Sequence, residues 1–322
     1  GGFLFYPSAQ YASFNFFLIA LFILASGLTF LETAANPYMT VLGSPETSAL
    51  RLNLAQSFNG VGSFIGPIMG GMLFFSSTSS ASSKLDSVKY VYLIIGAIVL
   101  IIGCCFLFTS MPEGRANDLK NTSDNSITPL SKQRHFLWAV AAQFFYVAAQ
   151  VGIAALFINY CTEHGVGISN KNASFLLSAS LLLFTIGRFT GTALMDIVAP
   201  NKLLAIYSCC NLILCIIVVL VKGMLSIYCL MAVFFFESIM FPTIFALGVK
   251  DLGDNTKKGA SFIIMAIVGG AIMPVVMGSI AQKYSTAFSY IVPLVCFVVV
   301  FLFAIKGYKI KSNETVLSYT GP

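Results

Sequence analysis

Two acidic residues of this 322-residue chain lie deep inside apolar stretches, where a carboxyl group is well suited to carry a proton. They are Glu32 and Glu237. No Lys or Arg is expected at their depth, because Arg188 is placed near the end of its own stretch. A carboxyl in a low dielectric with no cation beside it favours its neutral form. We therefore predict that Glu32 and Glu237 act in proton coupling. The alternative for each is a neutral acid that hydrogen-bonds a neighbouring helix.

Polar and helix-breaking residues follow Glu32 directly. Asn36 lies one helical turn later on the same face, and Pro37 comes next. Proline has no N–H, so it leaves a backbone carbonyl without its helical partner and interrupts the helix. An acid, an amide and a broken helix together predict a polar cavity at this point of the chain.

The pattern around Glu32 occurs twice, which identifies an internal repeat. Residues 31–43, LETAANPYMTVLG, match residues 236–248, FESIMFPTIFALG, at a separation of 205 positions. The matched pairs are Glu32/Glu237, Thr33/Ser238, Pro37/Pro242, Leu42/Leu247 and Gly43/Gly248. The next stretch aligns at a separation of 207, through Arg51/Lys258, Gly62/Gly269, Pro67/Pro274 and Gly71/Gly278. Two parallel halves, each a helix bundle, are an architecture found among membrane transporters.

The repeat also serves as an internal control for three amides. Asn53, Gln56 and Asn59 are spaced three apart and share one helical face. Their repeat partners are Ala260, Ile263 and Ala266. The fold therefore does not require polar side chains here, and a buried amide without a partner is costly. We predict that the three amides bind a polar ligand. Polar packing between helices is the alternative.

A second set of polar and aromatic residues lies in the later part of the chain. Gln143, Tyr146 and Gln150 share a face at spacings of three and four, and Phe241 occupies the repeat position of Asn36. Amides and phenols hydrogen-bond hydroxyl groups, and aromatic rings cover the apolar faces of sugars. We predict that these residues line a binding site together with the amides above. Core packing is the alternative for Phe241.

Two further charged residues occur in GRFTGTALMD, residues 187–196. Arg188 and Asp196 lie at the end of an apolar stretch. We predict that they form a charge latch between helices. In the alternative, the Arg188 side chain simply extends from the membrane toward water.

The elements that must hold these residues are membrane-spanning helices. The chain is 57% hydrophobic and only 9% charged, whereas a soluble domain is about 25% charged. This composition excludes a soluble enzyme, a nucleic-acid-binding module and a disordered scaffold. Nine stretches are long enough to span a lipid bilayer, at roughly 11–35, 52–75, 89–110, 136–160, 173–195, 203–221, 225–248, 259–281 and 286–306. Residues 1–7 are expected to end a tenth, so that the chain is a fragment beginning inside a helix.

Metal and cofactor sites are not expected. The eight cysteines lie in or beside apolar runs, no CxxC occurs, and His135 and His164 are isolated. Such cysteines act as small hydrophobic side chains.

Polar segments divide the chain and indicate its orientation. Residues 113–134 are predicted to be a linker between a partial N-terminal bundle, 1–112, and a C-terminal bundle, 135–311, with a tail at 312–322. Alternating the loops places 13 of the 18 Lys and Arg residues on the side of the linker. Because positive charge marks the cytoplasmic side, we expect a multi-pass cell-membrane protein with linker and C-terminus in the cytoplasm.

These motifs match a known family. FLETAANPYMTVLG followed by RLNLAQSFNGVG strongly resembles the fucose–galactose–hexose permeases of the major facilitator superfamily, and AQFFYVAAQVGI, GRFTGTALM and SIMFPTIFALGVKDLG resemble their second half. The resemblance covers essentially the whole chain. It implies an all-α, two-bundle fold of twelve helices, of which this chain would run from the end of the third to the twelfth.

The same resemblance implies a function and site roles. The function is proton-coupled uptake of a monosaccharide, L-fucose or a hexose such as galactose or glucose, by alternating access across a bacterial inner membrane, by a monomer. It makes Glu32 the coupling acid, and Gln56 and Asn59 amides of the sugar cavity. Two departures are the absence of the family's first-helix acid and the presence of Phe241 where fucose permeases often have Tyr.

Rival functions remain open at this point. A sugar facilitator, a sodium-coupled hexose carrier and a transporter-like sugar sensor would share most of these features. A membrane enzyme would need a nucleophile, base or metal set facing one site, and the sequence contains no such set. Uptake by the full-length protein distinguishes these classes.

Overall fold

The computed structural model describes residues 1–11, 13–74, 81–110, 129–165 and 167–310, and it describes their side chains except at 66–74 and 81–88. These residues form helices and no strands. Most of the predicted linker 113–134 and the predicted tail 312–322 lie outside the described residues. The division of the chain at the linker therefore stays a prediction.

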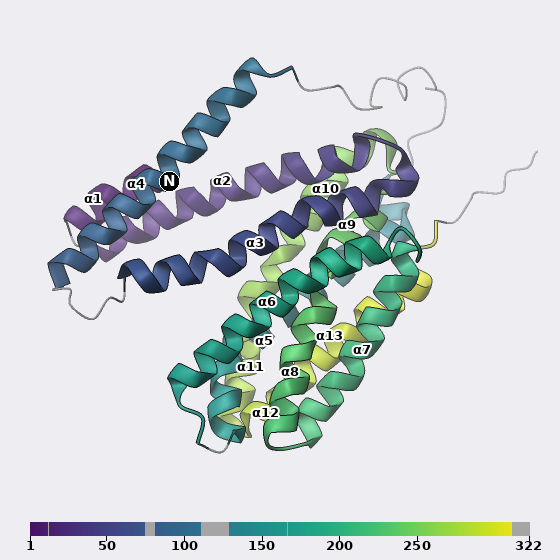
Figure 1. Ribbon diagram of the computed structural model, residues 1–322. Coiled ribbons are helices and arrows are strands. Elements are labelled where there is room, and N and C mark those ends of the chain that lie inside the picture. Colours follow the sequence, from purple (N-terminus) through teal and green to yellow (C-terminus); the bar gives the residue numbers. More distant parts are fainter. Residues whose placement is uncertain (12, 75–80, 111–128, 166, 311–322) are drawn as a thin grey trace, which may run out of the picture.

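The helices form two groups (Figure 1). The first group contains α1 (Phe5–Gln10), α2 (Phe14–Val41), α3 (Ser48–Phe74) and α4 (Ala81–Phe108). The second contains α5 (Arg134–His164), α6 (Asn170–Leu194), α7 (Pro200–Leu220), α8 (Met224–Glu237), α9 (Met240–Val249), α10 (Thr256–Met265), α11 (Gly269–Lys283), α12 (Thr286–Ser289) and α13 (Ile291–Leu302). The two groups also contain shorter helical turns. One is the π-helical turn η8 (Phe303–Gly307), and the others are the 3-10 turns η1 (Gly2–Leu4), η2 (Pro45–Thr47), η5 (Leu130–Lys132), η6 (Gly253–Asn255) and η7 (Ala266–Val268).

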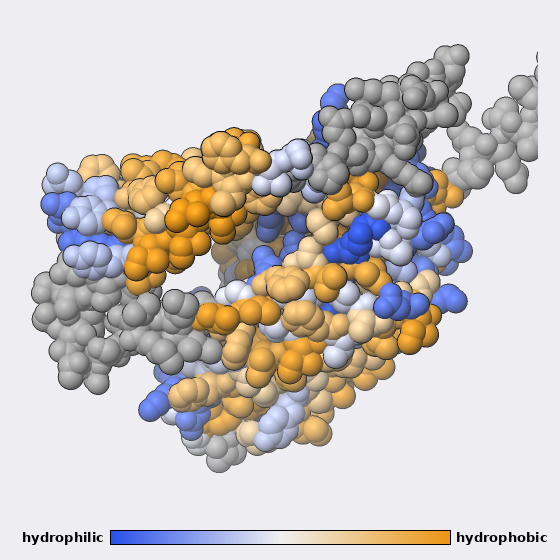
Figure 2. All heavy atoms as spheres, turned by 45° about the horizontal axis from the view of Figure 1, so that its top comes forward, coloured by the Kyte–Doolittle hydropathy of each residue, from blue (hydrophilic) through white to orange (hydrophobic). Residues whose placement is uncertain are grey.

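Most of the predicted spans are confirmed. Within the described residues, 8 helical stretches are long and apolar enough to cross a membrane, and they correspond to eight of the nine predicted ones. The remaining stretch, 52–75, falls on α3, a helix of 27 residues that ends at Phe74. Apolar side chains cover much of the outer surface of both groups (Figure 2). This surface suits a lipid solvent, and the protein is a multi-pass membrane protein.

The second group has a continuous apolar core centred on α5. This helix packs against α11, α13, α9 and α6. Its buried side chains include Tyr146, Ile153 and Phe157, which meet Phe234 and Phe297 of other helices in one cluster. By contrast, long stretches of α2 and α4 are exposed in the described structure, as at Phe30 and Leu107.

The two groups meet mainly through α3. This helix packs on α6 and α9, and α2 packs on α10. At Gly60 of α3, an added Cβ would lie 3.3 Å from Cδ of Arg188 and 3.4 Å from the Thr185 hydroxyl. The absence of a side chain at Gly60 therefore lets α6 approach closely and brings Arg188 against α3.

The predicted helix interruption at Pro37 is wrong, and the break occurs in the other repeat. Pro37 lies inside the continuous helix α2. Spanning helices tolerate proline where neighbouring groups satisfy the freed backbone atoms. In the second repeat, the span divides at Ser238 and Ile239, between α8 and α9. Pro242 then lies in the first turn of α9, where a missing N–H costs nothing.

Candidate substrate and proton site

The amides of α3 form a chain of hydrogen bonds with α2. Asn36 is buried, with 3% of its surface exposed, and its Oδ1 accepts a hydrogen bond from Nε2 of Gln56 at 3.0 Å. The two helices join through η2 and pack on each other, so residues twenty positions apart in the sequence meet. The structure thus brings two predicted ligand residues together.

Arg188 of α6 extends this chain across to the second helix group. Its Nη1 donates to the main-chain oxygen of Gln56 and, at 3.2 Å, to the Oε1 of the same residue. Its guanidinium lies over the ring of Phe184, 4.6 Å from the ring centroid. Asn36, Gln56 and Arg188 therefore form one connected polar path from α2 through α3 to α6.

Arg188 also corrects the expectation that no cation lies near the two carboxyls. It is 5% exposed and interacts electrostatically with Glu32 and with Glu237. The α6 helix continues for two further turns to Leu194, so the guanidinium lies within the protein rather than at a helix end. The predicted stretch 173–195 ends where α6 ends, so what hydropathy did not show is that α3 packs over Arg188.

The structure does not bring the two predicted latch residues together. Asp196 follows the end of α6 and is exposed. Arg188 does connect helices, but through Gln56 and the electrostatic interactions with the two acids.

Hydroxyl groups add further contacts between the two groups. Nδ2 of Asn53 donates to the Thr243 hydroxyl of α9 at 3.1 Å. The hydroxyls of Ser57 and Thr192 lie 3.5 Å apart. These contacts and the Arg188–Gln56 bonds form a set that we call the interface ladder, which runs along one face of α3.

The sequence contains a signal for the interface ladder. Thr185, Arg188 and Thr192 are spaced three and four apart, so they share one face of α6. The Thr185 hydroxyl donates to the carbonyl of Gly60 at 3.0 Å. A polar face within an apolar stretch predicts contact with a polar partner, which here is α3.

The remaining predicted site residues lie in different surroundings. The side chain of Asn59 is exposed and is not part of the hydrogen-bonded chain of Asn36 and Gln56. Gln150 and Phe241 are half-buried, and Phe241 packs against the core of the second group.

Three predicted residues lie inside the second group instead. Gln143, Tyr146 and Glu237 are each 0% exposed. The Tyr146 hydroxyl donates to the main-chain oxygen of Glu237 at 3.1 Å. Neither amide atom of Gln143 and neither carboxyl oxygen of Glu237 has a hydrogen-bond partner among the described residues. The predicted residues thus divide between the interface and an internal layer.

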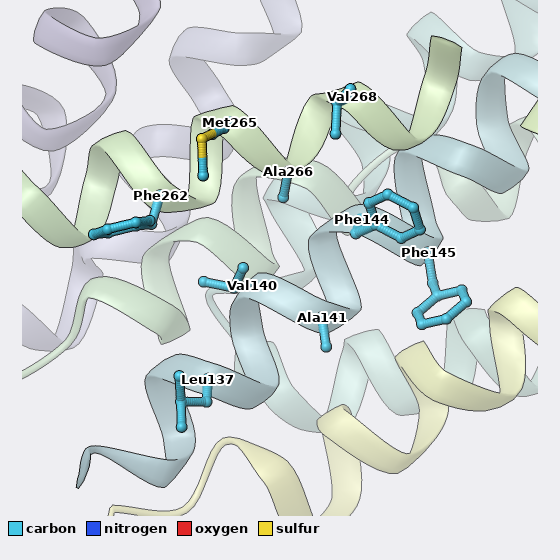
Figure 3. Close-up of a pocket in the computed structure, with 9 residues that line it drawn as sticks. All are labelled: Leu137, Val140, Ala141, Phe144, Phe145, Phe262, Met265, Ala266 and Val268. Atoms are coloured by element: carbon cyan, nitrogen blue, oxygen red, sulfur yellow. The ribbon is translucent and has the colours of Figure 1, made fainter. Parts of the chain in front are cut away.

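An apolar pocket of about 700 Å³ lies between α5 and the α10–η7 segment (Figure 3). It is lined by Leu137, Val140, Ala141, Phe144, Phe145, Phe262, Met265, Ala266 and Val268. Such walls offer no hydrogen-bond donor or acceptor side chain, so they cannot orient a polyhydroxylated ligand. The polar path of Asn36, Gln56 and Arg188 is the better candidate for recognition.

Known proteins are similar to this chain in sequence and in fold. The chain is 38% identical over 326 residues to the L-fucose-proton symporter of Escherichia coli (strain K12), covering 94% of this chain and 74% of the relative. It is 34% identical over 309 residues to the glucose/galactose transporter of Brucella abortus (strain 2308), covering 95% and 75%. It superimposes on the crystal structure of FucP, a major facilitator superfamily transporter in the outward conformation, with a TM-score of 0.85 and 38% identity over 94% of this chain and 78% of that one.

The family profile described as Major Facilitator Superfamily matches residues 1–267. This match agrees with the resemblance of the FLETAANPYMTVLG and RLNLAQSFNGVG motifs and with the helical fold. The chain belongs to the major facilitator superfamily.

Proposed function

We propose that this protein takes up a monosaccharide together with protons, by alternating access of a site between its two helix groups. The observation that carries the proposal is the polar path at the interface, in which Asn36, Gln56 and Arg188 are hydrogen-bonded in series beside Glu32. The names of the relatives support the substrate class, since one is a symporter of L-fucose and protons and another transports glucose and galactose.

The sugar contacts both helix groups in this proposal. Amides of Asn36, Gln56 and Asn59 hydrogen-bond its hydroxyls from the first group, while Gln150 and the ring of Phe241 approach from the second. Asn59 and Gln56 retain partly or fully exposed side chains for this purpose. Asn53 is already hydrogen-bonded to Thr243. Its amide therefore belongs to the interface ladder first and can contact the sugar only when that hydrogen bond is released.

Proton coupling rests on Glu32 and Arg188. When Glu32 is charged, it attracts the guanidinium of Arg188 electrostatically. When Glu32 is protonated, this attraction is lost, while the hydrogen bonds of Arg188 to Gln56 remain. Sugar that competes for the Gln56 amide then weakens the last polar link of Arg188 to α3. Proton and sugar thereby act on the same connection between the halves.

The ladder is the closed gate of this cycle. It joins α3 to α6 and α9 near the ends of these helices at Ser48, Leu194 and Val249. We place these ends, the linker and the C-terminus on the cytoplasmic side of a bacterial cell membrane, with a monomer as the functional unit. The protein acts as a carrier and not as an enzyme.

Uptake by the full-length protein in liposomes tests this function. The assay compares L-fucose, D-galactose and D-glucose, each with an inward proton gradient, with the gradient abolished by an ionophore, and with sodium replaced by choline. Accumulation that needs the proton gradient and not sodium supports the proposal. Equilibration without accumulation indicates a facilitator, dependence on sodium indicates a sodium-coupled carrier, and binding without uptake indicates a sensor.

A further inference from the structure

Four buried polar side chains of the second helix group lie at a similar depth. Gln143 and Tyr146 are 9 and 12 residues after Arg134, the start of α5. Asn211 is 11 residues after Pro200, the start of α7, and Glu237 is 12 residues before Val249, the end of α9. Because these three helix ends lie on the same side of the group, similar residue counts correspond to similar depths along the helices.

Contacts between the helices connect these residues laterally. The Tyr146 hydroxyl donates to the main-chain oxygen of Glu237, and Gln143 lies one turn before Tyr146 on the same face. Glu237 interacts electrostatically with Cys215, and Asn211 lies one turn before Cys215 on α7. Since α5 and α7 both pack on α8, Gln143, Asn211 and Glu237 surround one region of the interior.

The polar atoms of this region lack protein partners. Gln143, Asn211 and Glu237 are each 0% exposed, and in each residue both terminal polar atoms make no hydrogen bond within the described residues. More than nine in ten buried polar groups in folded proteins are hydrogen-bonded to protein or to ordered water. Six unpartnered atoms in one layer therefore point to a small polar occupant.

We propose that Gln143, Asn211 and Glu237 enclose an internal water site in the second helix group. Ordered waters bridge the two amides to a neutral Glu237 carboxyl, which has both a donor and an acceptor to offer. A buried carboxylate without a bonded cation is costly and is avoided by neutralisation. Arg188 interacts with Glu237 electrostatically but donates no hydrogen bond to it. The positive charge of Arg188 also opposes a second cation in the same region.

The proposed water site lies beside the break between α8 and α9, where water can bond helix carbonyls. Glu237 is the last residue of α8, next to the break at Ser238 and Ile239. The final carbonyls of a helix lack intrahelical donors, and Tyr146 supplies a donor for only one of them. Water in this layer supplies others and exchanges partners when α8 and α9 bend relative to each other. Glu237 keeps its proton through this bending and is a positioning residue in this inference, whereas Glu32 exchanges its proton.

The water site is tested by whether the substitution Asn211→Leu lowers or raises the melting temperature. Asn211→Leu removes both amide atoms and fills their space with a side chain of similar size. In a water site it strands the remaining polar groups, and the melting temperature of the full-length protein falls by roughly 2–8 °C. The matched control is Asn159→Leu at an exposed position of α5, where little change is expected. An unchanged or raised melting temperature for Asn211→Leu overturns the proposal, because deleting an isolated dry amide is stabilising.

Two further measurements test the water site if Asn211→Leu does not fold. A high-resolution structure of the full-length wild type should show waters within hydrogen-bonding distance of Gln143, Asn211 and Glu237, and direct pairing of the three side chains contradicts the proposal. Sodium chloride should stabilise wild type and Glu237→Gln equally relative to choline chloride. A sodium effect lost in Glu237→Gln identifies a bound cation instead.

Discussion

Arg188 donates hydrogen bonds to both the main-chain oxygen and the side-chain Oε1 of Gln56, although Arg188 and Gln56 lie 132 positions apart in the sequence. This pair joins α6 to α3 and uses the same amide that donates to Asn36. Gln56 therefore has both of its polar ends engaged while the interface ladder is closed. Any ligand that takes the Gln56 amide must compete with Arg188 or Asn36.

Arg188→Lys should impair coupled transport, because a lysine ammonium cannot reproduce the fixed geometry of the guanidinium. Hydrogen bonds to a charged group contribute about 1.5–3 kcal/mol, so the balance between closed and open interfaces should shift by roughly tenfold or more. We expect a comparable fall in sugar accumulation by proteoliposomes. Arg134→Lys at an exposed site is the control. Equal accumulation by both variants contradicts the proposed role of Arg188.

Asn59→Ala should weaken sugar binding and leave the fold intact. Ala266 occupies the repeat position of Asn59, and the Asn59 side chain is exposed in the structure. One lost hydrogen bond contributes about 0.5–1.5 kcal/mol, and about 3 if a buried partner is stranded, so affinity should fall between a few-fold and about a hundredfold. Calorimetric titration of the full-length protein measures this, with Asn159→Ala as control. Failure of Asn59→Ala to fold would mean that the amide is structural.

Substitutions at the Asn53–Thr243 contact show whether Asn53 acts in the interface ladder or binds the sugar. Thr243→Val keeps the side-chain shape and removes the acceptor of the Asn53 bond. If Asn53 serves the ladder, Thr243→Val and Asn53→Ala should destabilise the protein non-additively, with a coupling energy of about 0.5–1.5 kcal/mol in a double-mutant cycle. Sugar affinity should then change similarly in both variants. A loss of affinity confined to Asn53→Ala would instead assign Asn53 to the sugar.

The apolar spans could be predicted from the sequence because length and composition suffice to identify a helix that crosses a bilayer. The repeat predicts that α2 corresponds to α8 and α9, which carry Glu237 and Pro242, and that α3 corresponds to α10 and α11. The burial of Arg188 could not be predicted, since hydropathy located the end of α6 but does not reveal which neighbouring helix covers a charged residue near that end. The continuity of α2 through Pro37 could not be predicted, since it depends on how neighbouring groups accommodate the carbonyl that proline leaves without its helical donor. The separation of Gln143 and Glu237 from the interface depended on tertiary packing.

Glu32→Gln in the full-length protein tests the central claim most directly. The amide is nearly isosteric and imitates the protonated acid permanently, so no proton is released and gradient-driven sugar accumulation should be lost. Exchange of labelled for unlabelled sugar needs no net proton movement and should persist at least in part. Glu46→Gln, at an exposed site beyond the same helix, is the matched control and should accumulate sugar normally. Accumulation against the sugar gradient by Glu32→Gln would contradict the assignment of proton coupling to Glu32.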